Sequence, residues 1–429
     1  MISFALAERS EKAREIAESL ARLQKHRLIK PIRRIELETK LGYVCVIARE
    51  REFILEDDFL AACTYFPSES SRILKALAEV DSPTELRKKL LSIDGFYSGA
   101  IVSSDWIALF RDHVGHMPLA YRDEGFAACL ERGALGPEAR QLPPGSILVL
   151  RPEERKVERW YEPKVRQIND PPRILAESLL EVAGKYLPAR FHLGFSGGLD
   201  SSILAFLGIL LGKKVEAIVI GVEGCLDHRW AEDAVRLLDL PLKLIRVSDE
   251  EILKAAEILR RHLPEAGRMD LAIGSIMYLA ALRSERFLVV GQGADELFGG
   301  YWKYEDALRR NWRRAEELMR RDLENIHLRN LERDELATAL AGSQLVAPYL
   351  ARSIYELACS MGLELKLRKV NGKIVRKWIL REAAERLGVP AEIVQRSKKA
   401  AQYSSGIQKK LKRLLGRVGD RLNERDYLV

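Results

Sequence analysis

Long apolar runs are absent from this chain of 429 residues. The longest, residues 203–211, contains nine residues and is interrupted by Gly208, whereas a helix that crosses a bilayer needs about 20. The first 14 residues carry five charges, which is not typical of a secretory signal peptide. The sequence therefore predicts no membrane-spanning segment, and we expect a cytoplasmic protein.

Cysteine is scarce and scattered, with five residues and no C-x-x-C pair. This pattern excludes a disulfide framework and a zinc site made of paired cysteines. Asparagine and glutamine are also rare and total 14 residues, whereas 31% of the chain is charged. Few thermolabile amides among many charges are typical of a thermophilic source.

Neither sign of charge dominates. Lys and Arg total 70, and Asp and Glu total 62, which leaves a formal net charge of +8. An excess of this size suits an anionic ligand such as a nucleotide, but over 429 residues it is too small to indicate a nucleic-acid partner. The length and the 47% of apolar residues are ample for two packed domains.

Residues 1–165 combine short strand patterns with occasional helices, which predicts an α+β sandwich. Two strand patterns flank the turn sequence Ser103-Ser104-Asp105 and indicate a hairpin. The expected elements are a helix over residues 11–24 and strands over residues 43–48, 98–102, 106–110 and 147–150.

A proline-rich linker over residues 162–172 precedes a change in the pattern of predicted strands and helices. Apolar strands then alternate with helices, which is typical of a doubly wound parallel sheet, and helices dominate from about residue 304. The expected strands are residues 191–195, 215–222, 242–247 and 287–290, and the expected helices are residues 201–211, 230–238 and 250–261. We therefore predict two domains, residues 1–165 and 166–429.

The sequence SGGLDSS lies where one of these strands meets a helix. Its glycines let the backbone approach a ligand closely, and the N–H groups of such a turn attract an anion. Asp200 is suited to hold Mg²⁺ against phosphate oxygens. A serine-rich turn that merely caps a helix is the alternative. The pattern predicts a phosphate site formed by Ser196, Gly197, Gly198, Asp200, Ser201 and Ser202.

A second pattern, GQGADELFGGY over residues 291–301, follows the last of the predicted strands. It falls on the edge where an open α/β sheet binds ligands. Asp295 and Glu296 form a second acidic pair. We therefore expect a metal ion between Asp200 and Asp295.

Together the two patterns resemble the signatures of the asparagine synthetase family, which includes the β-lactam synthetases. Residues 196–202 resemble the family's pyrophosphate loop, and residues 292–301 resemble its second signature, which usually has Glu at the place of Gln292. Lys377 opens a K-x-x-L-R motif whose Lys contacts nucleotide phosphates in the family. Residues 329–335, 347–350 and 396–406 resemble further family motifs, so that the resemblance covers about residues 170–415.

The resemblance implies an adenine-nucleotide α-hydrolase-like fold and an ATP- and Mg²⁺-dependent ligase. In the family a carboxylate, most simply aspartate, attacks the α-phosphate of ATP, and ammonia or an amine captures the acyl-adenylate. The implied catalytic residues are Asp200, Asp295, Lys377 and Gln292, with Asp200 and Asp295 as metal ligands. Ile220, Gly221 and Gly291 match positions that line the adenine.

Residues 110–119 and 142–145 resemble segments of class II glutamine amidotransferases. That module hydrolyses glutamine with an N-terminal Cys, whereas Met1 is followed here by Ile2. We therefore expect a degenerate amidotransferase-like domain, with nitrogen supplied as ammonia or by a separate glutaminase subunit. A homodimer is compatible with the resemblance.

Several alternatives stay open at this point. The enzyme could be a β-lactam-synthetase-like cyclase, act on another carboxylate, or modify tRNA through adenylation, and a non-catalytic nucleotide sensor is the fourth possibility. His113 and His116 are interpreted as structural rather than as metal ligands. An arginine-rich segment, residues 309–321, is interpreted as a salt-bridged helix face rather than as an RNA-binding surface.

Overall fold

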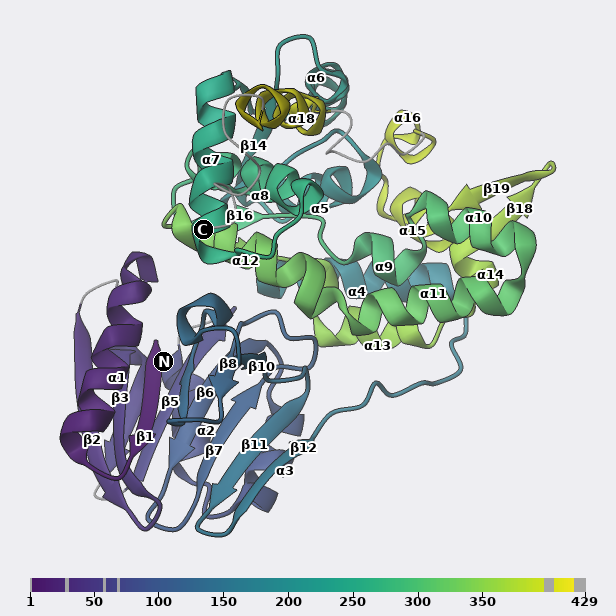
Figure 1. Ribbon diagram of the computed structural model, residues 1–429. Helices are drawn as coiled ribbons and strands as arrows, with labels where there is room; N and C mark the ends of the chain where they lie inside the picture. The colour runs from purple at the N-terminus through teal and green to yellow at the C-terminus, as the bar shows by residue number, and fades with distance from the viewer. Residues whose placement is uncertain (1, 28–30, 57–58, 68–69, 397–404, 420–429) are drawn as a thin grey trace. The chain divides into compact units, whose positions relative to one another are not determined.

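The computed structural model describes residues 2–27, 31–56, 59–67, 70–396 and 405–419. The chain divides into two compact units (Figure 1). The first consists of residues 1–165, 325–335 and 350–356, and the second of residues 166–324, 336–349 and 357–429. The first unit combines residues 1–165 with residues 325–335 and 350–356, two segments that lie within the predicted domain of residues 166–429. No described helix is long and apolar enough to span a membrane.

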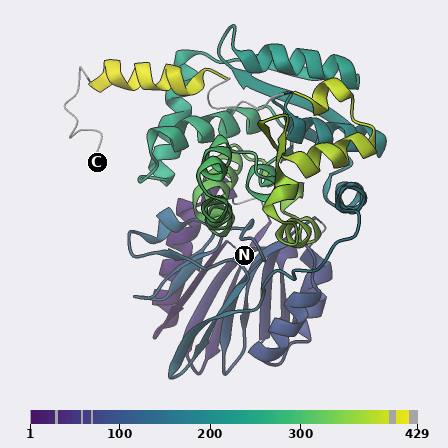
Figure 2. The same ribbon diagram turned by 90° about the vertical axis from the view of Figure 1, so that its right-hand side faces the viewer.

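Two antiparallel six-stranded sheets form the framework of the first unit, in the orders β10-β8-β9-β1-β3-β2 and β12-β11-β7-β6-β5-β4. Figure 2 shows their strands running side by side. The strands are β1 (Ser3–Ala7), β2 (Ile32–Thr39), β3 (Gly42–Arg49), β4 (Phe53–Glu56), β5 (Phe59–Phe66), β6 (Phe96–Val102), β7 (Ile107–Arg111), β8 (Ala120–Arg122), β9 (Ala127–Cys129), β10 (Arg140–Gln141), β11 (Ser146–Arg151) and β12 (Glu154–Arg159). The expected hairpin is confirmed, because β6 pairs antiparallel with β7.

Alternation along these strands explains the layers of the first unit. One set of side chains, which includes Phe4, Val46 and Leu109, fills the space between the sheets. The opposite set on the second sheet, which includes Ile101 and Phe110, packs with the helices α2 and α3. The helices of this unit are α1 (Ser10–Leu23), α2 (Ser70–Ala78) and α3 (Pro83–Ser92), and α1 packs on the outer face of the first sheet. The α+β sandwich is thus a helix–sheet–sheet–helix arrangement.

A five-stranded sheet forms the centre of the second unit, in the order β15-β14-β13-β16-β17. Every neighbouring pair is parallel, which confirms the doubly wound α/β expectation. The strands are β13 (Arg190–Gly194), β14 (Lys214–Gly221), β15 (Leu242–Arg246), β16 (Phe287–Val289) and β17 (Gln344–Val346). Leu193 and Val289 are fully buried at the centre of the sheet, as expected for strands covered on both faces.

Some helices cover this sheet, and others form a group beside it and continue to the end of the described chain (Figure 1). They are α4 (Pro171–Tyr186), α5 (Leu199–Leu210), α6 (Leu226–Leu238), α7 (Asp249–His262), α8 (Arg268–Ala281), α9 (Ala294–Phe298), α10 (Trp302–Arg310), α11 (Trp312–Glu324), α12 (Glu332–Leu340), α13 (Arg352–Cys359), α14 (Leu363–Lys366), α15 (Trp378–Leu387), α16 (Ala391–Val394) and α18 (Ile407–Gly419). Helices α12 and α13 each begin in the first unit and end in the second.

Three details differ from the expected elements. Helix α4 begins at Pro171, inside the predicted linker, because proline is well tolerated in a first helical turn. Helix α6 begins four residues earlier than predicted, at Leu226. Helices dominate the region after residue 304, as expected, but it also contains the unpredicted strand β17 and the hairpin β18 (Leu367–Val370) and β19 (Lys373–Arg376).

Candidate functional site

The candidate site lies where the strand order of the parallel sheet reverses. β13 lies between β14 and β16, and all three strands run parallel. The chain continues from β13 into α5 and from β16 into α9, so the two connecting loops separate at their carboxyl ends. Open α/β sheets bind ligands at such a switch point. Both sequence motifs follow one of these two strands.

The first loop turns tightly from β13 into α5. Gly197 has a φ of +66°, and a Cβ at this position would collide with the carbonyl oxygen of Trp230. The N–H of Gly198 donates to Ser196 Oγ over 3.4 Å. Because α5 begins at Leu199, its amino end faces this turn. A tight turn at a helix amino end is a favourable place for phosphate.

Two serines of the loop motif lie in the first turn of α5 and are buried. Ser201 Oγ donates to the Gly198 carbonyl over 3.3 Å. Ser202 Oγ has no hydrogen-bond partner among the described residues. An unsatisfied buried hydroxyl costs about 1–3 kcal/mol, which contact with a ligand oxygen would relieve.

Lys377 joins the two motifs. Its Nζ lies 2.5 Å from both carboxylate oxygens of Asp200 and 2.6 Å from Asp295 Oδ1. The lysine is only 2% exposed, whereas each carboxylate keeps 19% of its side chain exposed. Burial disfavours the charged amine, but the two carboxylates raise the pKa of Lys377 above its ordinary value. The amine is therefore a fixed positive charge beside the first loop.

The backbone at Lys377 supports a functional interpretation. Its φ is +57°, in the left-handed region that non-glycine residues rarely adopt. The residue stands between the end of β19 and the start of α15, so both elements hold it in place. Strained conformations of this kind concentrate at functional sites.

The carboxylates of Asp200 and Asp295 are suited to hold Mg²⁺. Both already contact a single cationic atom, Lys377 Nζ, so they converge on one position. Magnesium is typically bound by one or two carboxylates together with substrate phosphates. In the structure the lysine amine lies where the sequence analysis placed the ion, so an ion here would share the carboxylates with Lys377 or displace its amine.

Side chains pack closely against the backbone of the second loop. A Cβ on Gly300 would collide with Asp295 Oδ1 and Lys377 Cε, so only glycine fits against the ion cluster. Glu296 is buried and accepts a hydrogen bond from Tyr301 Oη over 2.7 Å. Gln292, the departure from the family pattern, is partly exposed in the same loop.

Other side chains, to which the sequence analysis gave no role, brace the two loops. Buried Tyr349 donates its hydroxyl to the Asp200 carbonyl over 3.0 Å. Arg376 donates to the Gly300 carbonyl over 2.9 Å. Arg396 donates to the carbonyls of Gly197 and Trp230 over 3.0 and 2.8 Å. All three belong to, or adjoin, family-like motifs, but no sequence pattern reveals which carbonyl an arginine will contact.

Ile220 and Gly221 end the neighbouring strand β14. A Cβ on Gly221 would lie 3.0 Å from His228 Nε2 and 3.3 Å from the Ser405 carbonyl, and would collide with Cys225 Sγ. Neither Cys225 nor His228 belongs to a sequence motif. Gly291, in the second motif, lies close to the first motif, because a Cβ on Gly291 would lie 2.9 Å from Asp200 Cβ.

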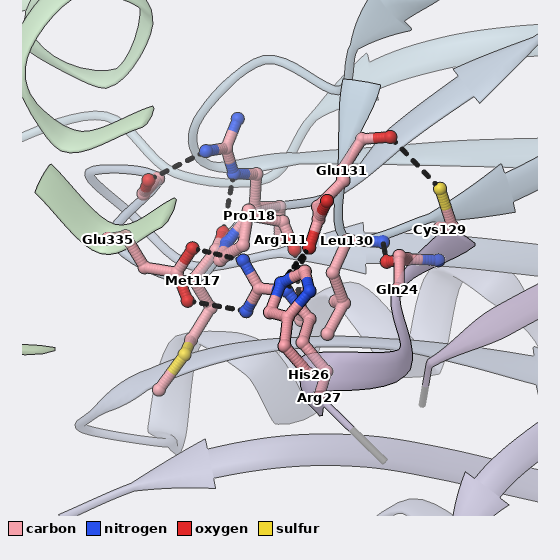
Figure 3. A network of polar contacts seen from close by, with 12 residues as sticks. Gln24, His26, Arg27, Arg111, Met117, Pro118, Cys129, Leu130, Glu131 and Glu335 are labelled. Carbon is pink, nitrogen blue, oxygen red and sulfur yellow. Dashed lines mark hydrogen bonds and ion pairs between the residues drawn. The ribbon is translucent and has the colours of Figure 1, made fainter. Parts of the chain in front are cut away.

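In the first unit, the amidotransferase-like motif forms a buried polar network (Figure 3). Arg111 is 1% exposed and donates to the carbonyls of Met117, Gly115 and Leu142 over 2.7, 2.7 and 2.9 Å. Asp112 accepts hydrogen bonds from four backbone N–H groups of residues 114–117. Most of these contacts lie within the amidotransferase-like segments, so Arg111 and Asp112 shape the loop.

The two weaker sequence candidates have structural roles. His113 is buried and its Nε2 lies 2.9 Å from the Leu350 carbonyl, while the ring of His116 stacks on Phe96 at 4.1 Å. On the arginine-rich segment, three arginines form i,i+4 ion pairs with acidic residues: Arg309–Glu305, Arg310–Asp306 and Arg320–Glu324. These pairs agree with a salt-bridged helix face.

A parallel sheet with two glycine-rich loops and an Asp–Lys–Asp cluster at its switch point is typical of nucleotide-binding α/β proteins of the pyrophosphate-loop type. The asparagine synthase family model matches residues 190–318 and 303–428. The chain belongs to the asparagine synthetase family. It is accordingly an ATP-dependent, amide-forming ligase in its general class.

The relatives agree with this assignment. A Methanocaldococcus jannaschii protein, assigned provisionally as a glutamine-hydrolysing asparagine synthetase, is 30% identical over 407 residues, covering 79% of this chain and 74% of that protein. A glutamine-hydrolysing asparagine synthetase of Oryza sativa is 25% identical over 349 residues, covering 73% of this chain. This chain spans only 58% of the rice enzyme.

Two solved structures are similar at a lower level. The NMN synthetase of Francisella tularensis is 14% identical with a TM-score of 0.31, covering 58% of this chain and 87% of that chain. A glutamine phosphoribosylpyrophosphate amidotransferase of B. subtilis is 12% identical with a TM-score of 0.32, covering 73% of this chain and 78% of that chain. Similarity at these scores carries no argument about fold or activity.

Proposed function

We propose that this protein adenylates a carboxylate with ATP and transfers the acyl group to ammonia or an amine, most simply to convert aspartate to asparagine. A carboxylate oxygen of the substrate attacks the α-phosphorus, and pyrophosphate leaves. The amine then attacks the acyl carbon, and AMP leaves. The observation that carries this proposal is the buried amine of Lys377, held between Asp200 and Asp295 beside the first loop.

Each part of the cluster has a role in this scheme. The turn at Gly197 and Gly198, with the amino end of α5, binds the phosphates. Lys377 supplies positive charge against the negative charge that builds on the departing pyrophosphate. Ile220, Gly221 and Gly291 lie at the strand ends beside these loops and are proposed to line the adenine. Gln292 is proposed to face the attacking amine.

Asp200 and Asp295 are the proposed magnesium ligands. Bound Mg²⁺ would neutralise phosphate charge and orient the leaving group. Because the two carboxylates also hold Lys377, they would fix the amine and the ion relative to each other. Removing either carboxylate would therefore affect both charges.

The first unit is proposed to be an amidotransferase-like domain without glutaminase chemistry. The glutaminase reaction needs a reactive thiolate. Within the described part of this unit the cysteines are all buried, and burial raises the pKa of Cys45 and Cys129 to about 12 and raises that of Cys63 as well. Ammonia, or nitrogen from a separate glutaminase chain, is the nitrogen source in this proposal.

Pyrophosphate exchange into ATP tests the adenylation step directly. We expect exchange that depends on Mg²⁺ and on one carboxylic acid, with aspartate as the first candidate of a panel. K377M should slow exchange by about 10²-fold or more, because it removes a preorganised charge on the reacting phosphates. K373M is the matched control, since Lys373 is an exposed lysine on the same hairpin. Equal loss in both variants, or full exchange in K377M, would contradict the assigned role of Lys377.

Nitrogen use is tested by measuring glutamate release and AMP formation side by side. We expect no glutamate from glutamine, and product from ammonium at high pH, where unprotonated NH₃ is abundant. Q292E should speed amidation, because a carboxylate can accept a proton from the attacking amine and an amide cannot. Glutamate released by the pure chain would refute the degenerate-amidotransferase proposal. AMP without asparagine would favour the cyclase or another amine.

A further inference from the structure

A cavity of about 790 Å³ lies in the second unit, lined by residues outside both loops of the candidate site. It is formed between the corner that joins α10 to α11 and the segment that runs from α14 into the β18–β19 hairpin. Cavities of roughly 300–1,000 Å³ are typical of small-molecule sites. Nothing in the proposed ligase reaction uses this cavity.

The floor of the cavity is apolar and rigidly supported. Leu367 is 2% exposed and belongs to a core cluster with Tyr304 and Met319, and Leu308 and Ile374 pack against that cluster. These side chains are fixed by packing whether or not a ligand is present. The floor therefore offers a preformed surface for an apolar body.

The walls carry charged side chains of both signs. Three cations, Arg309, Arg368 and Lys369, line the cavity, together with one carboxylate, Glu364. Arg368 is held over the Trp378 indole at 4.8 Å. Arg309 pairs with Glu305, and Arg368 lies 4.0 Å from Glu382, so the charges of both arginines are partly compensated. Lys369 is exposed and forms no ion pair within the described parts of the chain, so its amine is the cation best placed to attract an anionic group.

Trp312 stands at the rim and is 44% exposed. Exposing half of a tryptophan leaves a large apolar face in water, and a flat ligand stacked on it would remove that face from water. A flat apolar body on the floor would thus lie beside the indole, with its charged group near the cations.

We propose that this cavity binds an organic anion that combines a flat apolar body with a carboxylate or phosphate group. The site is separate from the first loop, but it shares the hairpin that leads into Lys377. Leu367 also packs beneath the second loop, because a Cβ on Gly299 would lie 3.1 Å from its Cδ2. Binding to this cavity does not depend on the proposed ligase reaction, so either proposal can be refuted without the other.

Calorimetric titration of the full chain with 1-naphthyl phosphate, without ATP, tests the proposal. We expect one site for 1-naphthyl phosphate. 1-Naphthol and inorganic phosphate should each bind at least about tenfold more weakly, because the first lacks the anionic group and the second lacks the flat apolar body. W312A and the double variant R368Q/K369Q should each weaken binding by about tenfold or more. W302A and R310Q are the controls, since Trp302 and Arg310 are exposed on α10 but do not line the cavity.

Several results would overturn the proposal. Unchanged affinity in W312A and R368Q/K369Q would place the probe elsewhere, and competition by ATP with Mg²⁺ would place it on the first loop. Equal affinity for 1-naphthol would remove the requirement for an anion. An oligonucleotide that binds more tightly than 1-naphthyl phosphate, and is lost in the same variants, would reassign the cavity to nucleic acid.

Discussion

At the scale of single residues, two buried cations show how partners compensate for buried charge. Lys377 is buried between two carboxylates, and Arg111 is buried among carbonyl oxygens. His113 and His116 are instead buried in the neutral form, because burial lowers the pKa of each to about 3. A change in pH therefore affects the paired cations and the neutral histidines in opposite ways.

The two histidines predict a loss of stability in acid. The unfolded chain protonates each histidine below its ordinary pKa of 6.5, whereas the folded chain does so only near pH 3. Their contribution is therefore fully present above pH 6.5 and falls by about 1.4 kcal/mol per histidine for each pH unit below it. Urea unfolding measured from pH 7.5 down to about pH 5 should show this slope.

H116L should keep stability at pH 7.5 and reduce the slope, because neither ring nitrogen of His116 has a hydrogen-bond partner among the described residues. H113L should also reduce the slope, but it should lower stability at every pH, since it removes the contact with the Leu350 carbonyl. A slope unchanged in both variants would show that other groups cause the acid sensitivity.

At the scale of elements, the loops at the switch point depend on glycine where strands and helices crowd together. In G300A the added methyl would displace Asp295 or Lys377. Because misplacing a catalytic group by about 1 Å can cost 10²-fold in rate, we expect pyrophosphate exchange to fall by about that factor. G184A, in α4, is the control, because a Cβ there meets no atom within 4 Å.

G184A should leave exchange unchanged and should raise stability by about 0.5–1 kcal/mol, because alanine restricts the unfolded chain more than glycine does. Exchange rates and urea unfolding of the two variants are compared with those of the unmodified chain. Normal exchange in G300A would mean that the second loop can shift without disturbing Lys377.

Elements were predictable from sequence where their pattern was long and strongly apolar. β14 and β13 were found because covered parallel strands are nearly continuous apolar runs. β17 was missed because only two of its three residues are apolar, whereas β16, of the same length, belongs to the apolar run of residues 287–290. The hairpin β18–β19 was missed for a similar reason, because its strands have only four residues each.

The motifs of the candidate site were predictable from sequence, but the contact that joins them through Lys377 was not. The motifs alone indicated that Asp200 and Asp295 would meet at one edge of the sheet. The ion pair with Lys377 joins residues 177 positions apart and depends on the backbone turn after β19. The two motifs predict a metal between the carboxylates, because no sequence pattern places the lysine amine there.

At the scale of the whole molecule, the chain passes between the two units several times. Residues 325–335 and 350–356 pack with the first unit although they lie within the second domain expected from sequence. Arg27 holds one of these segments, because it donates to both carboxylate oxygens of Glu335 at 2.7 Å and to Glu131 at 2.7 Å (Figure 3). Helix α12 then continues from Glu332 into the second unit.

This arrangement predicts that R27M destabilises the whole protein. Arg27 is 6% exposed, and its loss would take the arginine cation away from buried Glu131 and from partly buried Glu335. Breaking a buried ion pair from one side typically costs about 3–5 kcal/mol. R33M is the control, since Arg33 and Glu50 form an exposed pair, and such pairs contribute about 1 kcal/mol or less.

Urea unfolding should be followed by fluorescence and, in parallel, by the residual pyrophosphate exchange. Because α12 belongs to both units, melting of the first unit would unravel the helix that leads to β17 and Tyr349, and Tyr349 contacts the backbone of Asp200. Exchange should therefore disappear at the same urea concentration as the fluorescence change, and both midpoints should fall together in R27M. If R27M shifted the fluorescence midpoint but left the exchange midpoint in place, the units would unfold independently, and the shared helix would not couple them.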